Sequence, residues 1–386
     1  MTPPGLTAGI LAAGLVVSAI QEPPRPAAPA DLAAAITALG SFDLAARTAA
    51  ARIVRRAPAA TAGPELERAV RSHPDEYVRF RALVIFAGMN DDVRALVRDV
   101  MSDRNDRLRT VAYQWLEHHP EASVVPALLS ALARERSEFV RPALTRALAA
   151  HGKDPKVQQV LVPLVARGED MFRGALIEAL GDYRATYAVA AIADVAKLDG
   201  PLQDDAITAL GKIGDPSARP ALAGLQQTAP AAVQPTLSAA FCLLGIDCER
   251  QEPFLKESWQ FALRSQDIDL VRGSAHAFGM LAADGRLWAL ASLLEAGAAA
   301  ADPAREAVAL TVGLVALRRP LLLLDLLSDR PATDRSSDVV LDAFDMLSED
   351  FEEEWFYVAI RDALWAAPEG SPRRRAAESL LATLEF

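Results

Sequence analysis

Apolar residues recur along most of this chain at the three- and four-residue spacing of an amphipathic helix. One side of the stretch DMFRGALIEALGDY carries the apolar residues Phe172, Leu176, Ala179 and Leu180. A second helical segment, YAVAAIADVAKL, follows it, and the first pattern then returns as DDAITALGKIGD. The pattern predicts short helices in pairs, about ten pairs between residues 31 and 386. Stacked at helix-packing distances, they would form a rod or arc roughly 80–100 Å long.

A glycine recurs near the end of the first helix of the pattern. It stands at intervals of 30, 34, 34 and 34 residues: Gly181, Gly211, Gly245, Gly279 and Gly313. Glycine commonly ends a helix because it adopts the left-handed conformation without a Cβ penalty. We therefore expect these glycines to lie at helix C-termini.

An arginine recurs near the start of the same helix, three or four residues after an acid. The arginines are Arg47, Arg79, Arg109, Arg141 and Arg173, with later copies at Arg272 and Arg305. The acids suit the first turn of a helix, where they accept from free N–H groups. The arginines could form a groove for anionic ligands, but their matched acids favour ion pairs within and between repeats.

The segment TALGKIGDPSARPALAGL resembles a HEAT-like repeat, in particular the type named after phycobilisome lyases. The matching parts are the Leu-Gly helix end, the Gly-Asp-Pro turn at residues 214–216 and the apolar helix after it. The resemblance covers residues 40 to 320 and is strongest between 170 and 225. It implies an all-α fold, an α-solenoid, with residues 321–386 as a divergent C-terminal repeat or cap. It implies little about activity, because such repeats occur in scaffolds, enzyme subunits and adaptors.

The amino-acid composition suits an all-helical fold, and the net charge limits the classes of binding partner. Hydrophobic residues make up 51% of the chain but aromatic residues only 6%, so Ala and Leu dominate. The formal net charge is −11. Binding to a phosphate backbone depends on Lys and Arg, so this charge disfavours a nucleic-acid partner.

The first 20 residues form an uncharged apolar segment after Met1, and residues 21–30 form a Pro-rich tether. The segment has the length of a signal-peptide core, although no Lys or Arg precedes it. Export to the periplasm, cell envelope or exterior is the favoured prediction, ahead of a cytoplasmic location. A membrane contact is expected only if the segment stays uncleaved as an anchor.

Cys242 and Cys248 are the only cysteines, on either side of the helix end expected at Gly245. An oxidising compartment would let them form a disulfide. Alternatively, Cys242 is a small buried residue and Cys248 has no role.

The family resemblance implies that one helix of each pair lines the concave side. Positions three and seven residues before each repeat marker give a chemically mixed row of candidate partner-binding residues: Gln114, Arg146, Glu178, Asp204, Arg272, His276 and Glu306. The row has neither a single sign of charge nor an aromatic platform for single strands. It favours a protein or peptide partner.

The sequence offers no strong catalytic, cofactor or metal motif. Neither a phosphate-binding loop nor a Gly-x-Ser-x-Gly elbow is present, and the neighbouring histidines His118 and His119 read as solvated helix-end residues. Cys242 and His276 fall in the same row and form a weak catalytic pair. We therefore expect no catalytic residue, no cofactor and no metal.

Five acids fall between Glu349 and Glu354, directly before the aromatic residues Trp355 and Phe356. This segment could bind a basic partner, but sealing the last repeat is favoured, since terminal repeats are atypical. Taken together, the sequence predicts a non-catalytic scaffold or adaptor that binds a protein or peptide on its concave side. The alternatives are a lyase-like accessory subunit of an enzyme and a HEAT-like nucleic-acid binder.

Overall fold

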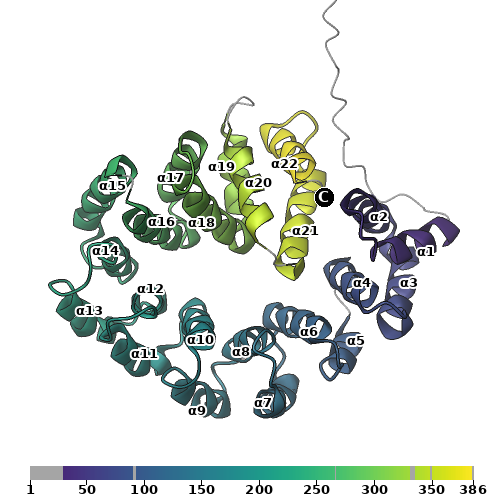
Figure 1. The fold of residues 1–386 in the computed structure, drawn as a ribbon, viewed down its shortest axis with the longest axis horizontal. Helices are drawn as coiled ribbons and strands as arrows, with labels where there is room; N and C mark the ends of the chain where they lie inside the picture. The colour runs from purple at the N-terminus through teal and green to yellow at the C-terminus, as the bar shows by residue number, and fades with distance from the viewer. Residues whose placement is uncertain (1–28, 90–92, 266, 331–334, 348–349, 385–386) are drawn as a thin grey trace, which may run out of the picture.

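The helix pairs predicted from the sequence are present, and their stacking bends the chain into a ring (Figure 1). The structure is a computed structural model that describes residues 29–89, 93–265, 267–330, 335–347 and 350–384. In these residues it contains 22 α-helices, which form eleven pairs, and no strand. The all-α solenoid is thereby confirmed, whereas the expected open rod or arc is wrong. The N-terminal segment and residues 21–28 of the tether lie outside the described residues, whereas residues 29 and 30, predicted as the end of the tether, begin α1.

Each pair has an inner helix, facing the centre of the ring, and an outer helix (Figure 1). The first pair is α1 (Pro29–Ala38) and α2 (Leu44–Arg56). The inner helices that follow are α4 (Glu76–Met89), α6 (Asp106–His118), α8 (Arg141–Ala149), α10 (Asp170–Asp182), α12 (Gln203–Ile213), α14 (Gln234–Leu243), α16 (Ile268–Ala283), α18 (Ala304–Arg318), α20 (Ser336–Met346) and α21 (Asp350–Ala366).

The outer helices cover the far side of the inner ones. They are α3 (Ala59–Ser72), α5 (Arg94–Val100), α7 (Val125–Arg134), α9 (Pro155–Leu164), α11 (Val189–Ala196), α13 (Arg219–Leu225), α15 (Cys248–Ser265), α17 (Leu287–Ala299), α19 (Pro320–Ser328) and α22 (Pro372–Thr383). Three short 3₁₀ helices precede α7, α11 and α13: η1 (Ala122–Val124), η2 (Thr186–Ala188) and η3 (Pro216–Ala218). Buried apolar side chains form one continuous core between the two layers, from Leu32 to Leu381.

Three of the seven repeated arginines, Arg79, Arg173 and Arg305, bind carbonyl groups at the ends of outer helices. Arg79 donates to the carbonyl oxygen of Val70 at 2.7 Å, and Arg173 donates to that of Val165 at 3.0 Å. Arg109 adds an ion pair with Glu135 at 2.9 Å. Carbonyls in the last turn of a helix lack intrahelical donors, so each of these three arginines satisfies one and ties the two helices of a pair together. At these positions the structural interpretation of the arginine repeat is confirmed.

The repeated glycines do not have the role that the sequence suggested. Only Gly245 has a left-handed backbone, with φ of 70°, whereas Gly181, Gly211, Gly279 and Gly313 lie inside inner helices. A Cβ on Gly181 would lie 2.9 Å from the Cα of Ala209, and one on Gly211 would lie 2.8 Å from the Cα of Ala240. Both distances are shorter than van der Waals contact. Glycine is therefore needed because neighbouring inner helices touch backbone to backbone, which shortens the inner side of the array.

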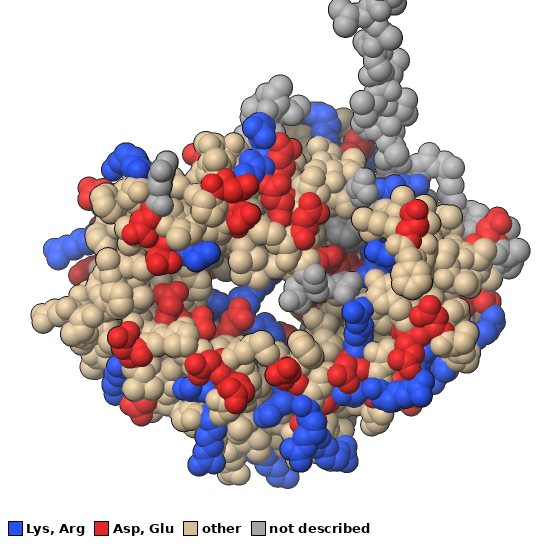
Figure 2. Space-filling view, in the orientation of Figure 1, with Lys and Arg blue, Asp and Glu red and all other residues tan. Residues whose placement is uncertain are grey.

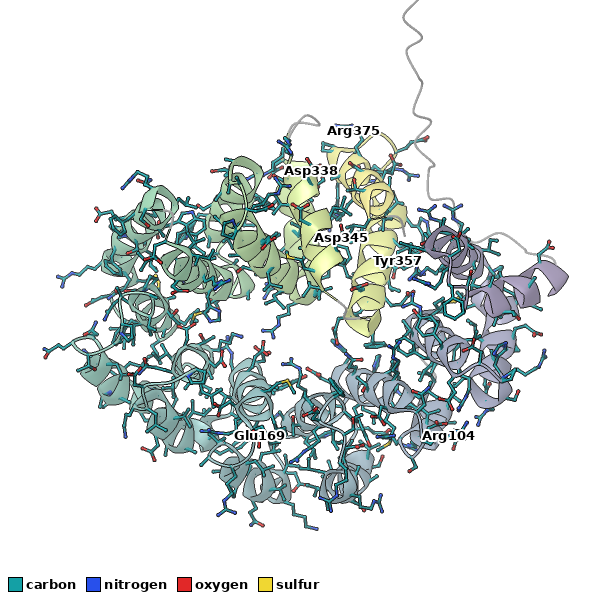
Figure 3. All side chains as sticks on the ribbon, in the orientation of Figure 1. Arg104, Glu169, Asp338, Asp345, Tyr357 and Arg375 are labelled. Carbon is teal, nitrogen blue, oxygen red and sulfur yellow. A yellow bond between two sulfur atoms is a disulfide. The ribbon has the colours of Figure 1, made fainter. Side chains whose placement is uncertain are left out.

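The two ends of the array meet, and α21 packs against α4 and α6 (Figure 1). We call this contact the seam. Arg55 of α2 donates through Nε to Glu354 of α21 at 3.0 Å, and the two side chains are only 7% and 1% exposed. The Arg55 guanidinium also lies 4.9 Å from the ring centre of Tyr357, which Figure 3 shows on the side of α21 that faces the N-terminal helices. Gly88 of α4 leaves room for Glu354, because a Cβ there would lie 2.8 Å from the Cγ of that residue.

His118 and His119 lie in the seam. The ring of His118 stacks on Trp355 with centroids 4.7 Å apart, and its Nε2 lies 3.1 Å from Glu352 Oε1. His119 stacks on Trp115 and meets Trp355 edge-on. The expectation of solvated histidines was therefore wrong, since the C-terminal segment covers them. The C-terminal segment covers the last repeat, as the sequence indicated, and it also covers the first repeats.

We predict that Gly181→Ala lowers the free energy of unfolding by about 1–3 kcal/mol, because the new methyl group must push α12 away. Inside a helix this substitution would otherwise be favourable by about 1 kcal/mol. Gly224→Ala in α13 is the matched control, because a Cβ there meets nothing within 4 Å. Urea unfolding of both variants compares the two sites. Equal or greater stability of Gly181→Ala would contradict the close-contact role.

We also predict that the seam weakens as the pH rises. Burial opposes protonation of His118, but the hydrogen bond and the charge of Glu352 outweigh burial and raise the pKa of His118. A raised pKa in the folded state stabilises the protein below the unfolded value of about 6.5, and the stabilisation is lost as the pH rises through the folded value. Relative to His118→Gln, the wild type should lose about 1 kcal/mol between pH 6 and pH 8.

Thermal unfolding of the wild type and His118→Gln at the two pH values measures this loss. Glu352→Gln should remove the same pH dependence, and the double variant should lose nothing more. An unchanged pH dependence in His118→Gln would show that the pair does not titrate in this range.

Candidate functional site

The inner side of the ring gathers charged residues from helices that are far apart in sequence. Figure 2 shows an opening at the centre of the molecule, with Lys and Arg and Asp and Glu around it. Of the seven predicted partner-binding residues, Arg146, Glu178, Asp204 and His276 contact residues on other inner helices. The remaining three lie apart from these contacts: half-buried Gln114 on α6, and exposed Arg272 and Glu306 on α16 and α18.

The larger group, which we call the inner charge network, joins α6, α8, α10, α12 and α18. Its cations are Arg146, Lys212 and Arg318, and its anions are Glu117, Glu178 and Asp182. Three positive and three negative charges balance. The network is therefore no surface of one sign, as the mixed row of residues in the sequence indicated.

Asp182 stands at the centre of the inner charge network. Its carboxylate accepts from Lys212 Nζ at 2.8 Å, from Arg146 Nη2 at 3.1 Å and from Arg318 Nη1 at 3.1 Å. Burial opposes ionisation, but these three cations lower the pKa of Asp182 to about 2. Arg318 also pairs with Glu178, so one side chain of α18 reaches across the ring to α10. The carboxylate thus stays charged at any physiological pH and holds three helices.

Arg146 connects this centre to α6. It donates through Nε to Glu117 at 2.9 Å, and the Tyr183 hydroxyl donates to the same carboxylate at 3.0 Å. Burial and the charge of Glu117 raise the pKa of Tyr183. The side chain of Glu117 is only 5% exposed, and Arg146 and Tyr183 supply its hydrogen bonds. This part of the network is therefore structural.

A second group, the inner polar cluster, lies at the other end of α12 and reaches α16. His276 Nε2 lies 2.7 Å from the Thr208 hydroxyl and 3.5 Å from Asp204 Oδ2. Burial raises the pKa of Asp205 to about 6, and its carboxylate lies against Gly174 of α10. Thr208 on α12 contacts His276 on α16 directly, although α14 comes between these helices in the array. The tight curvature brings α12 and α16 together.

This cluster does not have the geometry of a nucleophilic site. The same nitrogen of His276 faces both Thr208 and Asp204, whereas a catalytic triad uses both ring nitrogens. The weak candidate pair Cys242–His276 is not formed. Cys242 is instead joined to Cys248, with Cα atoms 4.4 Å apart. Within the described ranges no group of three or more His, Cys, Asp or Glu residues could hold a metal ion.

The sequence did not reveal the residues of the seam or the contacts that cross the ring. Arg55 and Glu354 lie 299 positions apart, and Arg318 and Glu178 lie 140 positions apart. No local motif marks such pairs. The only available signal was the acidic and aromatic character of residues 349–356, which indicated an unusual last repeat without indicating its neighbour.

The geometry defines the class: an α-solenoid repeat protein that closes on itself and presents a mixed, mostly polar inner side. Residues 93–181, which span α5 to α10, match the family model of HEAT repeats. This stretch of the chain therefore consists of HEAT-like repeats. Much of the match falls on repeats that lack the Leu-Gly ending, outside the stretch where the resemblance to the phycobilisome-lyase type was strongest. That finer type stays a prediction.

A comparison with curated proteins gave no match to this chain. In the described part of the chain no single helix is long and apolar enough to cross a membrane. The pair α18 and α19 passes the test of length and composition together, with a bend of 111° between them.

Proposed function

We propose that this protein is a non-catalytic scaffold or adaptor that binds a protein or peptide partner along the inner side of the ring. HEAT repeats often serve as scaffolds for protein interactions, which supports the general assignment. Such surfaces bind through area and shape. The partner class and the inner location are our inference.

The observation that carries this proposal is a pair of exposed leucines on the inner side of α18. Leu310 and Leu314 precede Arg318 at four-residue intervals, so the three residues share one side of the helix. Arg318 reaches across the ring to Glu178, which identifies that side as the inner one. The two leucines are nevertheless 41% and 44% exposed. Exposed leucines beside balanced charges suit a protein surface better than a nucleic-acid backbone.

A cross-linking experiment tests the location and the class of partner. A photoreactive amino acid is placed at Leu310 or Leu314, and the full chain is irradiated in its native host. Val160 on the outer helix α9 and Leu321 on α19 are matched controls with similar exposure, 38% and 45%. We expect one protein adduct from both inner positions and none from the outer ones, because only the inner leucines would be covered by the partner.

Equal labelling at inner and outer positions would contradict the proposal. An adduct that disappears after nuclease treatment would replace it with the nucleic-acid alternative. An adduct with a single enzyme whose activity depends on this chain would favour the accessory-subunit alternative.

We further propose that the protein is exported and that its disulfide forms there. The apolar residues 1–20, the Pro-rich tether and the bonded positions of Cys242 and Cys248 support this proposal. Intact mass of the protein from separated fractions of its native host should show a chain that begins near residue 20. Its mass should rise by about two daltons on reduction, for the two hydrogens that a disulfide gains. A full-length, reduced chain in the cytoplasmic fraction would contradict both parts.

A further inference from the structure

Three inner helices end in the same backbone motif, but one of them has an arginine where the others have glycine. After α14 the N–H of Ile246 donates to Phe241 O, and after α16 the N–H of Arg286 donates to Leu281 O. The residues before these donors are Gly245 and Gly285, with φ of 70° and 101°. After α10 the N–H of Ala185 donates to Leu180 O in the same way. The left-handed residue there is Arg184, with φ of 49°.

An arginine in this position costs stability that a glycine would not cost. The left-handed region crowds the Cβ of every residue except glycine, and bulky residues occupy it rarely. The side chain of Arg184 recovers little of this cost, because it is 71% exposed and its charge partner, Asp284, lies 4.0 Å away. Backbone strain of this kind concentrates at functional sites. The location of the guanidinium therefore needs a reason beyond the fold.

Arg184 lines a pocket of about 240 Å³ where α10, α12, α14, α16 and α18 end around the centre of the ring. Its charged lining residues are Asp182, Arg184, Lys212, Asp284, Arg318 and Arg319. Four cations and two anions leave a net charge of 4 − 2 = +2 on the pocket wall. This excess of positive charge occurs in a chain whose net charge is −11.

The four cations of the pocket differ in how many of their N–H donors already have a partner. Lys212 and Arg318 belong to the inner charge network and bind Asp182. Arg319 donates through Nη1 to the carbonyl oxygen of Ala283 at 2.9 Å, which fixes its guanidinium at the end of α16. Its other N–H groups, like those of Arg184, make no further hydrogen bond within the described residues. Two guanidinium groups thus offer donors to the pocket.

We propose that this pocket binds a carboxylate group, held by Arg184 and Arg319. Guanidinium groups bind carboxylates and phosphates through paired N–H donors. The pocket lies at the C-terminal ends of the helices around it, where the helix dipoles are negative, and it contains Asp182 and Asp284. These negative groups oppose the two charges concentrated on one phosphate group more than the single charge on each carboxylate group. The carboxylate can belong to a small free acid or to an acidic side chain of a bound peptide.

Calorimetric titration of the full chain with three probes tests the proposal. The probes are succinate, a terminally blocked tetraglutamate peptide and inorganic phosphate. We expect saturable binding of succinate or tetraglutamate. Arg184→Gly should weaken it by at least about tenfold, the loss expected for a charge-assisted contact. The same variant should raise the midpoint of thermal unfolding, because glycine relieves the left-handed residue.

Arg184→Asn gives a second variant, since asparagine tolerates this conformation and also lacks the charge. Arg104→Ala is the control for net charge, because Arg104 is 83% exposed and lies outside the pocket. It should leave binding unchanged. Succinate binding would indicate a free acid as the natural ligand. Binding of tetraglutamate alone would indicate an acidic segment of a partner.

The proposal is overturned if neither carboxylate probe saturates, if Arg184→Gly binds as tightly as the wild type, or if phosphate binds more tightly than both carboxylates. None of these results bears on the cross-linking at Leu310 and Leu314. The proposal of a carboxylate pocket and the proposal of a protein-binding surface can therefore be disproved independently.

Discussion

The close approach of neighbouring inner helices is the constraint on which the rest of this structure depends. Gly181 and Gly211 allow the backbones of α10, α12 and α14 to touch, and Gly279 and Gly313 leave room for side chains of the next inner helix, Thr311 and Ala343. A stack that is short on one side and long on the other must curve. In this chain the curvature accumulates over eleven pairs until α21 meets α4 and α6.

Closure changes the energetics of the terminal repeats. The last repeat of an open solenoid exposes one apolar side, which natural arrays cover with polar caps. Here the two ends cover each other, and the Arg55–Glu354 pair sits inside the contact almost without solvent. A buried pair adds little net stability by itself, but a seam that lacked either partner would contain an uncompensated charge. The pair therefore selects the register in which the two ends meet.

The sequence allowed the local parts of this structure to be predicted and missed the parts that depend on accumulated geometry. The helix pairs follow from apolar spacing, and the ion pairs of Arg109 and Arg173 follow from the acid three residues before each of them. The glycine spacing was recognised, but a glycine that ends a helix and one that allows close packing look alike in sequence. The seam could not be predicted, because a small error in the angle per repeat, multiplied along the chain, separates a ring from an open arc. For the same reason Arg146 and Glu178 were found as members of a row, whereas their links to Arg318, directly from Glu178 and through Asp182 from Arg146, were not.

The contacts that close the ring and those that cross its centre differ in their exposure to solvent, and the difference bears on binding. The side chains of Arg55 and Glu354 are almost fully buried, whereas those of Arg318 and Glu178 are 30% and 42% exposed. Exposed ion pairs contribute about 0–1 kcal/mol, since water competes for both groups. A ligand that offers its own charge to Arg318 or Glu178 can replace the Arg318–Glu178 contact at small cost and leave the Arg318–Asp182 contact and the seam intact. The inner side can thus exchange partners by moving side chains, while the helices that position those side chains stay closed.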